Sequence, residues 1–245
     1  MKTNGEKIKK VSQVLAAASY AIALTGAGLS TESGIRDFRG KNGVWTTDPE
    51  AERKAYQSFA KFKRDPKAHW IERLTTPALL GDLSGFEPNR GHLALAELES
   101  MGIIRAVITQ NIDNLHQEAG SKNVIEFHGN ASHLQCLRCG KEYEASGFDM
   151  SGKKIPLCSC GNILKPSVIF FGEMIPHEAL SRSAFYASRA DVVIVAGTSA
   201  VVYPAAAIPQ QARVNGAKII EFNIEETGLT ETGTDIFIHG SAGRT

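Results

Sequence analysis

The sequence has little net charge and no long hydrophobic run. Its 27 lysines and arginines nearly balance its 26 aspartates and glutamates, which gives a net charge of +1. This balance provides no strong field for nucleic acid or anionic lipid, so we expect no direct nucleic-acid partner. The apolar stretch nearest the N-terminus, Leu15–Leu24, has ten residues, whereas a membrane span needs about 20. We therefore expect no membrane partner and no targeting segment, and we predict a cytoplasmic location.

Cysteine is also scarce, and its four copies all lie between Cys136 and Cys160. Disulfides that staple a whole fold would be spread along the chain, so this clustering favours a metal site. The spacing is Cys136-x2-Cys139, then eighteen residues, then Cys158-x-Cys160. Four thiolates are the natural ligands of a structural zinc ion. Reduced buried thiols and a disulfide pair are the alternatives, and His133 ranks second as a possible ligand.

Apolar and amphipathic segments alternate along the chain. Buried strands are predicted at the segments YAIAL, IIRAVIT, VIEFHG, PSVIFFG, DVVIVAGTS, KIIEFNI and DIFIHG. Helices are predicted between them, at GEKIKKVSQVLAAAS, NRGHLALAELESMG, DNLHQEAG, HEALSRSAFYASRA and PAAAIPQQARVNG. Apolar strands separated by helices are typical of a parallel sheet that is covered on both faces. We therefore predict an α/β fold with a doubly wound parallel sheet.

Two stretches interrupt this alternation. Residues 46–89 are predicted to be mostly helical, from Glu50 to Gly81, and residues 132–165 carry the four cysteines. We expect the two stretches to form a small domain made of a helical insertion and a zinc-binding insertion. Residues 1–45, 90–131 and 166–245 would form the larger domain that contains the sheet.

Small and polar residues follow six of the predicted strands, where ligands bind in open parallel sheets. The glycines of the segment TGAG, Gly26 and Gly28, would let backbone N–H groups approach a diphosphate at the start of a helix. Side chains that could contact phosphate or ribose oxygens are those of Ser30, Thr198, Ser199 and Asn223. Each feature alone has an ordinary structural explanation, such as a glycine corner or a helix cap at Asp113. Together they predict a dinucleotide site.

The dinucleotide fingerprint G-x-G-x-x-G is incomplete, because Thr31 stands at the third glycine position. This disfavours a dehydrogenase. His128 follows a predicted strand in the segment EFHG, and an imidazole there can accept a proton near neutral pH. Asp37 and Arg39 could by themselves form a surface ion pair.

Five segments in fixed order resemble the sirtuin family of NAD-dependent protein deacylases: TGAGLSTESGIRDFRG, TQNIDNLH, HGN, PSVIFFGE and AGTSAVVYPAA. The likeness runs from about Ala16 to Arg244. It implies that the larger domain is a Rossmann-like NAD-binding domain and that the small domain carries a structural zinc ion. NAD and an acylated-lysine protein or peptide would meet in the cleft between the two domains.

The resemblance also implies roles for individual residues. The catalytic residues would be His128, as the base, and Asn111. The NAD contacts would be Gly26, Ala27, Gly28, Ser30, Asp37, Phe38, Arg39, Gln110, Asn111, Ile112, Asp113, Gly197, Thr198, Ser199, Asn223, Glu225 and Ala242. The peptide would be added as a strand beside Val168, Phe170, Gly172, Glu173, Val201, Val202 and Tyr203. The zinc ligands would be Cys136, Cys139, Cys158 and Cys160.

The implied reaction transfers the acyl group of acyl-lysine to ADP-ribose and releases nicotinamide, so that NAD is consumed. A mono-ADP-ribosyltransferase on the same fold is the alternative, because Gly43–Thr46 resembles sirtuin branches with weak acetyl-lysine turnover. A zinc-ribbon nucleic-acid binder is disfavoured by the slight basicity around the cysteines. Arg36 departs from the proline of the family pattern GIPDFR, which would make the cofactor loop more basic and less rigid. The Tyr and Arg pair of desuccinylase-type sirtuins is not found, because the corresponding segment HWIERLTTPALL has no tyrosine, so we expect neutral acyl groups, acetyl first.

Overall fold

The computed structural model describes residues 3–76, 83, 85–150 and 154–245. Its main sheet has six parallel strands in the order β3-β2-β1-β7-β8-β9. The strands are β1 (Ala21–Thr25), β2 (Ile104–Thr109), β3 (Val124–Glu126), β7 (Val192–Ala196), β8 (Lys218–Asn223) and β9 (Ile236–His239). The chain winds outward from β1 to β3 and then outward in the other direction from β7 to β9. The winding therefore reverses between β1 and β7, which confirms the predicted doubly wound sheet.

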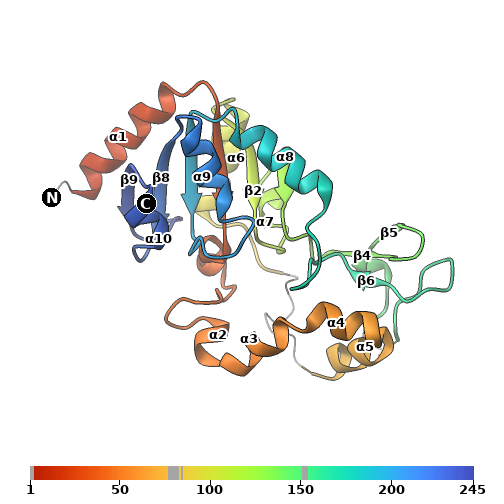
Figure 1. Cartoon of the computed structure of the whole chain (residues 1–245). Coiled ribbons are helices and arrows are strands. Elements are labelled where there is room, and N and C mark those ends of the chain that lie inside the picture. The colour runs from red at the N-terminus through yellow and green to blue at the C-terminus, as the bar shows by residue number, and fades with distance from the viewer. Residues whose placement is uncertain (1–2, 77–82, 84, 151–153) are drawn as a thin grey trace.

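Helices cover both faces of this sheet (Figure 1). On one face, α1 (Asn4–Ala16) and α6 (Arg90–Ser100) pack against Ala21 and Ala23 of β1. On the other face, α8 (His177–Ala187) and α9 (Ala207–Val214) pack against Ile22 and Leu24. Both faces of β1 are buried, which explains why its sequence shows no polar alternation. None of the described helices is long and apolar enough to cross a membrane.

Short helices connect the remaining strands near their carboxyl ends. These are the 3-10 helix η1 (Ala27–Ser33), α7 (Leu115–Glu118) and α10 (Gly228–Thr232). The helix η1 ends at Gly34, whose φ of 99° is a left-handed conformation that suits glycine.

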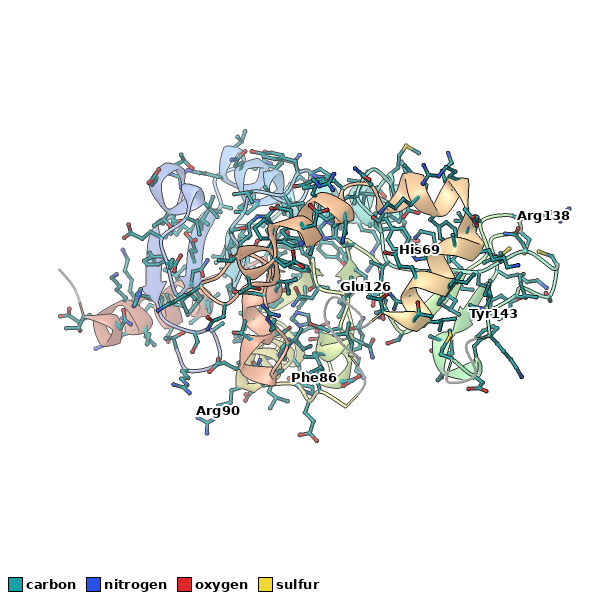
Figure 2. All side chains as sticks on the ribbon, turned by 90° about the horizontal axis from the view of Figure 1, so that it is seen from below. His69, Phe86, Arg90, Glu126, Arg138 and Tyr143 are labelled. Carbon is teal, nitrogen blue, oxygen red and sulfur yellow. The ribbon has the colours of Figure 1, made fainter. Side chains whose placement is uncertain are left out.

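The two insertions pack on each other at one end of the molecule (Figure 1). The helical insertion contains α2 (Val44–Thr47), α3 (Pro49–Ala55), α4 (Ser58–Arg64) and α5 (Pro66–Thr75), and residues 77–81 of the predicted helical stretch lie outside the described residues. The cysteine insertion contains β4 (His133–Gln135), β5 (Glu142–Glu144) and the 3-10 helix η2 (Ala145–Gly147). Phe62 and Trp70 of the helices share a buried core with Leu134 and Leu164. Figure 2 shows His69 of α5 and Tyr143 of β5 at this same end. The exact domain boundaries stay a prediction.

The predicted strand at PSVIFFG is wrong. Strand β6 contains only Lys165–Pro166, which pairs with β4 in a small antiparallel sheet of order β5-β4-β6. The N–H of Ser167 donates to the carbonyl oxygen of His133. The N–H of Ile169 donates to the carbonyl oxygen of His128. The segment thus bonds to two separate elements, so no continuous ladder forms. An apolar run alone does not reveal this difference.

Candidate active site

A cavity of about 1570 Å³ lies where the carboxyl ends of the main strands meet the helical and cysteine insertions, which together we call the small unit. Its wall includes every residue that the sequence predicted for the cofactor, the peptide and catalysis. The small unit contributes further wall residues, among them Trp45, Trp70 and Leu134. Pockets for a single small ligand have volumes of about 300–1,000 Å³. The cavity is therefore large enough to hold two ligands together at the topological switch point.

The glycine turn after β1 is a close-packed crossing of two backbone segments. A Cβ on Gly28 would lie 2.8 Å from the Cα of Gly197, and a Cβ on Gly26 would lie 2.7 Å from the Cβ of Thr198. The N–H of Gly26 donates to the carbonyl oxygen of Ala196 (3.0 Å), and that of Gly28 donates to that of Gly197 (2.8 Å). The N–H groups of Gly26 and Gly28 themselves thus donate within the protein, and the approach of other backbone N–H groups of this turn to a diphosphate stays a prediction. The glycines are required by the packing of the β1 turn on the β7 turn.

A network of buried side chains centred on the hydroxyl of Ser30 lies beside this turn. Ser30 donates to Oδ2 of Asp113 (2.6 Å) and accepts from Nδ2 of Asn111 (3.0 Å). In His92, Nδ1 accepts the N–H of Asn89 (3.3 Å), so the ring proton lies on Nε2, which is 3.4 Å from Ser30 Oγ. The Ser30 hydroxyl therefore orients Asn111 and Asp113, and its proton is not free for a phosphate.

A second buried histidine, His116, is connected to Asn111 through the hydroxyls of Thr25 and Thr109. The hydroxyl of Thr25 donates to that of Thr109 (2.9 Å), so it accepts from Nε2 of His116 (2.9 Å). The rings of His92 and His116 lie 4.9 Å apart. Burial lowers the pKa of His92 to about 4 and the pKa of His116 to about 3. Both rings are thus neutral near pH 7 and serve as fixed hydrogen-bonding groups.

His128 lies at the cavity wall directly after β3 and Phe127. Its Nδ1 lies 3.2 Å from the carbonyl oxygen of Gln110, which can only accept, so Nδ1 carries the ring proton. Nε2 then carries the lone pair, and it has no hydrogen-bond partner within the described ranges. Burial lowers the pKa of His128, and the bond to Gln110 offsets this only in part. The ring is therefore neutral at neutral pH, with one nitrogen available as a base.

The turns after β7 and β8 form another part of the cavity wall. Asn223 donates from Nδ2 to the carbonyl oxygen of Thr198 (3.0 Å) and accepts the N–H of Ile224 (2.9 Å). The hydroxyl oxygen of Thr198 accepts from Nε2 of Gln110 (3.0 Å). The hydroxyl of Ser199 has no hydrogen-bond partner in the part of the chain that the structure describes, and Ser199 lines the cavity. Thr198 and Asn223 thus hold the turns together, and Ser199 offers a free hydroxyl.

The loop of residues 36–47, which we call the cofactor loop, folds back on itself beside the cavity. The N–H of Trp45 donates to the carbonyl oxygen of Phe38 (2.9 Å), and the two rings lie 4.7 Å apart. The guanidinium of Arg39 lies 4.4 Å from the Trp45 ring and pairs with Glu52 (3.1 Å). Arg39 lines the cavity as predicted, and its charge is already neutralised by a carboxylate.

Arg36 connects the two ends of the cofactor loop. Its Nε donates to the carbonyl oxygen of Asn42 (3.2 Å), and its Nη2 lies 3.0 Å from the same oxygen. Nη2 also approaches Oγ1 of Thr47 (2.6 Å) and the carbonyl oxygen of Gly43 (3.4 Å). A proline at this position could make none of these contacts, so Arg36 braces the loop in a different way.

The sulfur atoms of the four cysteines form one cluster and lie within 4.8 Å of one another. Sγ of Cys136 is 3.6 Å from that of Cys160, and Sγ of Cys139 is 3.5 Å from that of Cys158. These distances exclude the disulfide alternative, whose S–S bond is about 2.05 Å. Zn–S bonds of about 2.3 Å in a tetrahedron place the sulfurs roughly 3.8 Å apart, so the cluster fits zinc. His133 pairs instead with a carboxylate of β5 and lies outside the cluster.

Phe171 lines the cavity but was not among the predicted residues. Its ring lies 4.6 Å from that of Tyr56 and 5.7 Å from that of Trp45. The family resemblance implied Phe170 and not its neighbour, but both rings line the cavity. The adjacent aromatic pair before Gly172 was the sequence signal that could have identified it.

The Sir2 family model matches residues 26–204 of this chain. The NAD-dependent protein deacylase of Thermococcus kodakarensis is 46% identical over 239 residues, which cover 95% of this chain and 90% of the relative. The solved Sir2 homologue–NAD complex has a TM-score of 0.81 and 40% identity, and it covers 96% of this chain and 90% of its own. A Sir2 complex with a deacetylated p53 peptide and 3′-O-acetyl ADP ribose has a TM-score of 0.82 and 35% identity. The match covers 97% of this chain and 94% of the solved one. The chain belongs to the Sir2 family, the sirtuins.

Proposed function

We propose that this protein is an NAD-dependent protein-lysine deacetylase, which transfers the acetyl group of acetyl-lysine to ADP-ribose and releases nicotinamide. The observation that carries the proposal is His128, whose Nε2 has no partner among the described residues, in the same cavity as the strand-end residues of the parallel sheet. The relative in Thermococcus kodakarensis is named an NAD-dependent protein deacylase. The solved relative with a deacetylated peptide and acetyl ADP ribose supports deacetylation over mono-ADP-ribosyl transfer.

The nicotinamide end of NAD would be held by Asn111 and Asp113, which the Ser30 network fixes in position. NAD supplies the ADP-ribosyl group that accepts the acetyl group, and nicotinamide is its leaving group. The adenosine half would lie at the turns after β7 and β8, where Ser199 offers a free hydroxyl. The other predicted NAD contacts line the same cavity, which supports their assignment.

His128 would act as the general base on a ribose hydroxyl. Its Nδ1–H is fixed by the Gln110 carbonyl oxygen, so Nε2 can take the proton without a change of tautomer. The acyl-lysine peptide would lie beside the segment 168–173 and the turn 201–203, whose predicted contact residues line the cavity. A zinc ion bound by the four cysteines would stabilise the small unit and take no part in the chemistry. We keep the cytoplasm as the expected location.

Nicotinamide release tests this function. It should require NAD and an acetyl-lysine peptide together, and His128→Ala should lower kcat by a factor on the order of 10² or more. His177→Ala is the matched control, because His177 is an exposed residue at the start of α8 and is not among the cavity residues. Nicotinamide release that does not depend on the peptide, or a fully active His128→Ala variant, would contradict the proposal.

A further inference from the structure

Lys165 is a buried cation between the cysteine insertion and the cavity wall. Its side chain is 1% exposed, and its Nζ pairs with Oε2 of Glu173 at 2.9 Å, where the carboxylate side chain is 12% exposed. Burial lowers the pKa of Lys165, and the carboxylate of Glu173 partly offsets this. A buried ammonium group is costly unless every donor is paired. Its retention at this position calls for a physical reason.

All three N–H donors of the ammonium group have partners. Besides Glu173, the Lys165 Nζ donates to the carbonyl oxygens of Pro166 (2.9 Å) and Val168 (2.6 Å). Glu173 Oε2 also accepts the N–H of Phe170 (2.9 Å), and the Phe170 ring lies 4.3 Å from the ammonium nitrogen. The ion pair thus fixes backbone groups at three positions of the segment 166–173.

The same segment leaves other backbone groups unpaired. Across the ranges that the structure describes, the N–H groups of Val168, Phe171 and Gly172 have no hydrogen-bond partner, and all three residues line the cavity. Backbone groups in this state can pair with an added peptide strand. The groups fixed by the ion pair and the groups left free belong to one short segment, so the first set determines where the second set lies.

The backbone of Lys165 is itself held by the cysteine insertion. In the β4–β6 pair, Gln135 is opposite Lys165 and Leu134 is opposite Pro166. Cys136 follows Gln135 directly in the chain. Lys165 therefore connects two parts of the structure. Its backbone pairs with the strand that leads to the cysteine cluster, and its ammonium group holds the segment at the cavity edge.

We propose that Lys165 is a positioning residue for the acyl-lysine peptide, because its ion pair with Glu173 sets the backbone of 166–173 in the conformation to which the peptide strand is added. This inference rests on the proposed function. Lys165 itself does not line the cavity, so it would contact neither the peptide nor NAD. Its loss should therefore affect peptide binding and leave NAD binding nearly unchanged.

The test compares Lys165→Met, Lys165→Arg and Glu173→Gln with the wild type, and Lys154→Met, at an exposed lysine, is the control. The readouts are KM for peptide and for NAD, the Kd of a fluorescent acetyl-lysine peptide, and the zinc content. Lys165→Met should raise the peptide KM and Kd about tenfold, with less than about a twofold change in KM for NAD and normal zinc content. Lys165→Arg keeps the charge and should recover part of the loss.

Equal increases in both KM values would overturn the proposal, and so would an unchanged peptide Kd in Lys165→Met. If Lys165→Met fails to fold, Glu173→Gln decides, since it keeps the side-chain shape and should raise the peptide Kd by about threefold or more. An unchanged Kd in that variant would refute the role. Failure of the proposed function is distinguishable, because the wild type would then release no nicotinamide in response to peptide.

Discussion

Replacing Arg36 with alanine removes the brace of the cofactor loop. The guanidinium contacts three acceptors, on Asn42, Gly43 and Thr47, and these contacts connect the start of the loop with α2. Arg36 is exposed, so each hydrogen bond is worth at most about 0.5–1.5 kcal/mol. We take about 1–1.4 kcal/mol for the whole set, which corresponds to a five- to tenfold change in the ratio of ordered to disordered loop. Global stability should change by less than about 0.5 kcal/mol, as for other surface changes.

Steady-state kinetics and limited proteolysis measure the loss. Arg36→Ala should raise KM for NAD by about three- to tenfold, since a partly disordered loop reduces the fraction of binding-competent protein. Chymotrypsin, whose target residues Phe38 and Trp45 are present in both variants, should also cut within the loop faster than in the wild type. Lys41→Ala is the matched control, because Lys41 is an exposed residue of the same loop that does not line the cavity. A KM for NAD within twofold of wild type, with unchanged proteolysis, would refute the bracing role.

Three further changes test other parts of the structure. The free energy of unfolding should fall as pH drops from about 6.5 toward 4, by roughly 1.4 kcal/mol per pH unit for each of His92 and His116. The reason is that the pKa values of His92 and His116 are about 4 and about 3 in the folded state, so the unfolded chain binds these protons first. Urea midpoints that do not change over this pH range would contradict the prediction. Gly28→Ala should lower the free energy of unfolding by about 1–3 kcal/mol, because the added Cβ would lie 2.8 Å from the backbone of the β7 turn. Gly147→Ala is the control and should leave it nearly unchanged, because an added Cβ there would have no neighbouring atom within 4 Å. Thermal unfolding measures both. Chelation of zinc should loosen the core around Trp70, and this should shift tryptophan emission to longer wavelength and abolish deacetylation. An unchanged emission spectrum would argue against a structural zinc site.

The parallel sheet could be predicted because its strands carry strong local signals. Segments such as VVIVA are apolar at every position, and they are separated by helices with clear ends. Asn89 caps α6 through its contact with the N–H of Gly91, and Gly102 follows its end with a φ of 75°. Ligand residues at strand ends follow from the topology of such sheets, which is why the predicted set lines one cavity.

The features that the sequence did not reveal depend on contacts of individual side chains and turns. PSVIFFG has the composition of a strand, but Lys165 and Glu173 hold its backbone, and only its first residue, Pro166, pairs with a strand. The role of Gly26 and Gly28 could not be deduced from their spacing, because it depends on Gly197, which lies far along the chain. A single sequence likewise does not show that Arg36 reaches across its own loop. In each case the deciding contact leaves no periodic pattern in the sequence.

Mass spectrometry of the products formed from NAD and an acetyl-lysine peptide tests the central claim most directly. The proposed function predicts deacetylated peptide, nicotinamide and O-acetyl-ADP-ribose in equal amounts, formed more slowly by a factor on the order of 10² or more with His128→Ala. ADP-ribose attached to the protein or the peptide, with the acetyl group still on lysine, would contradict deacetylation and establish the transferase reaction instead.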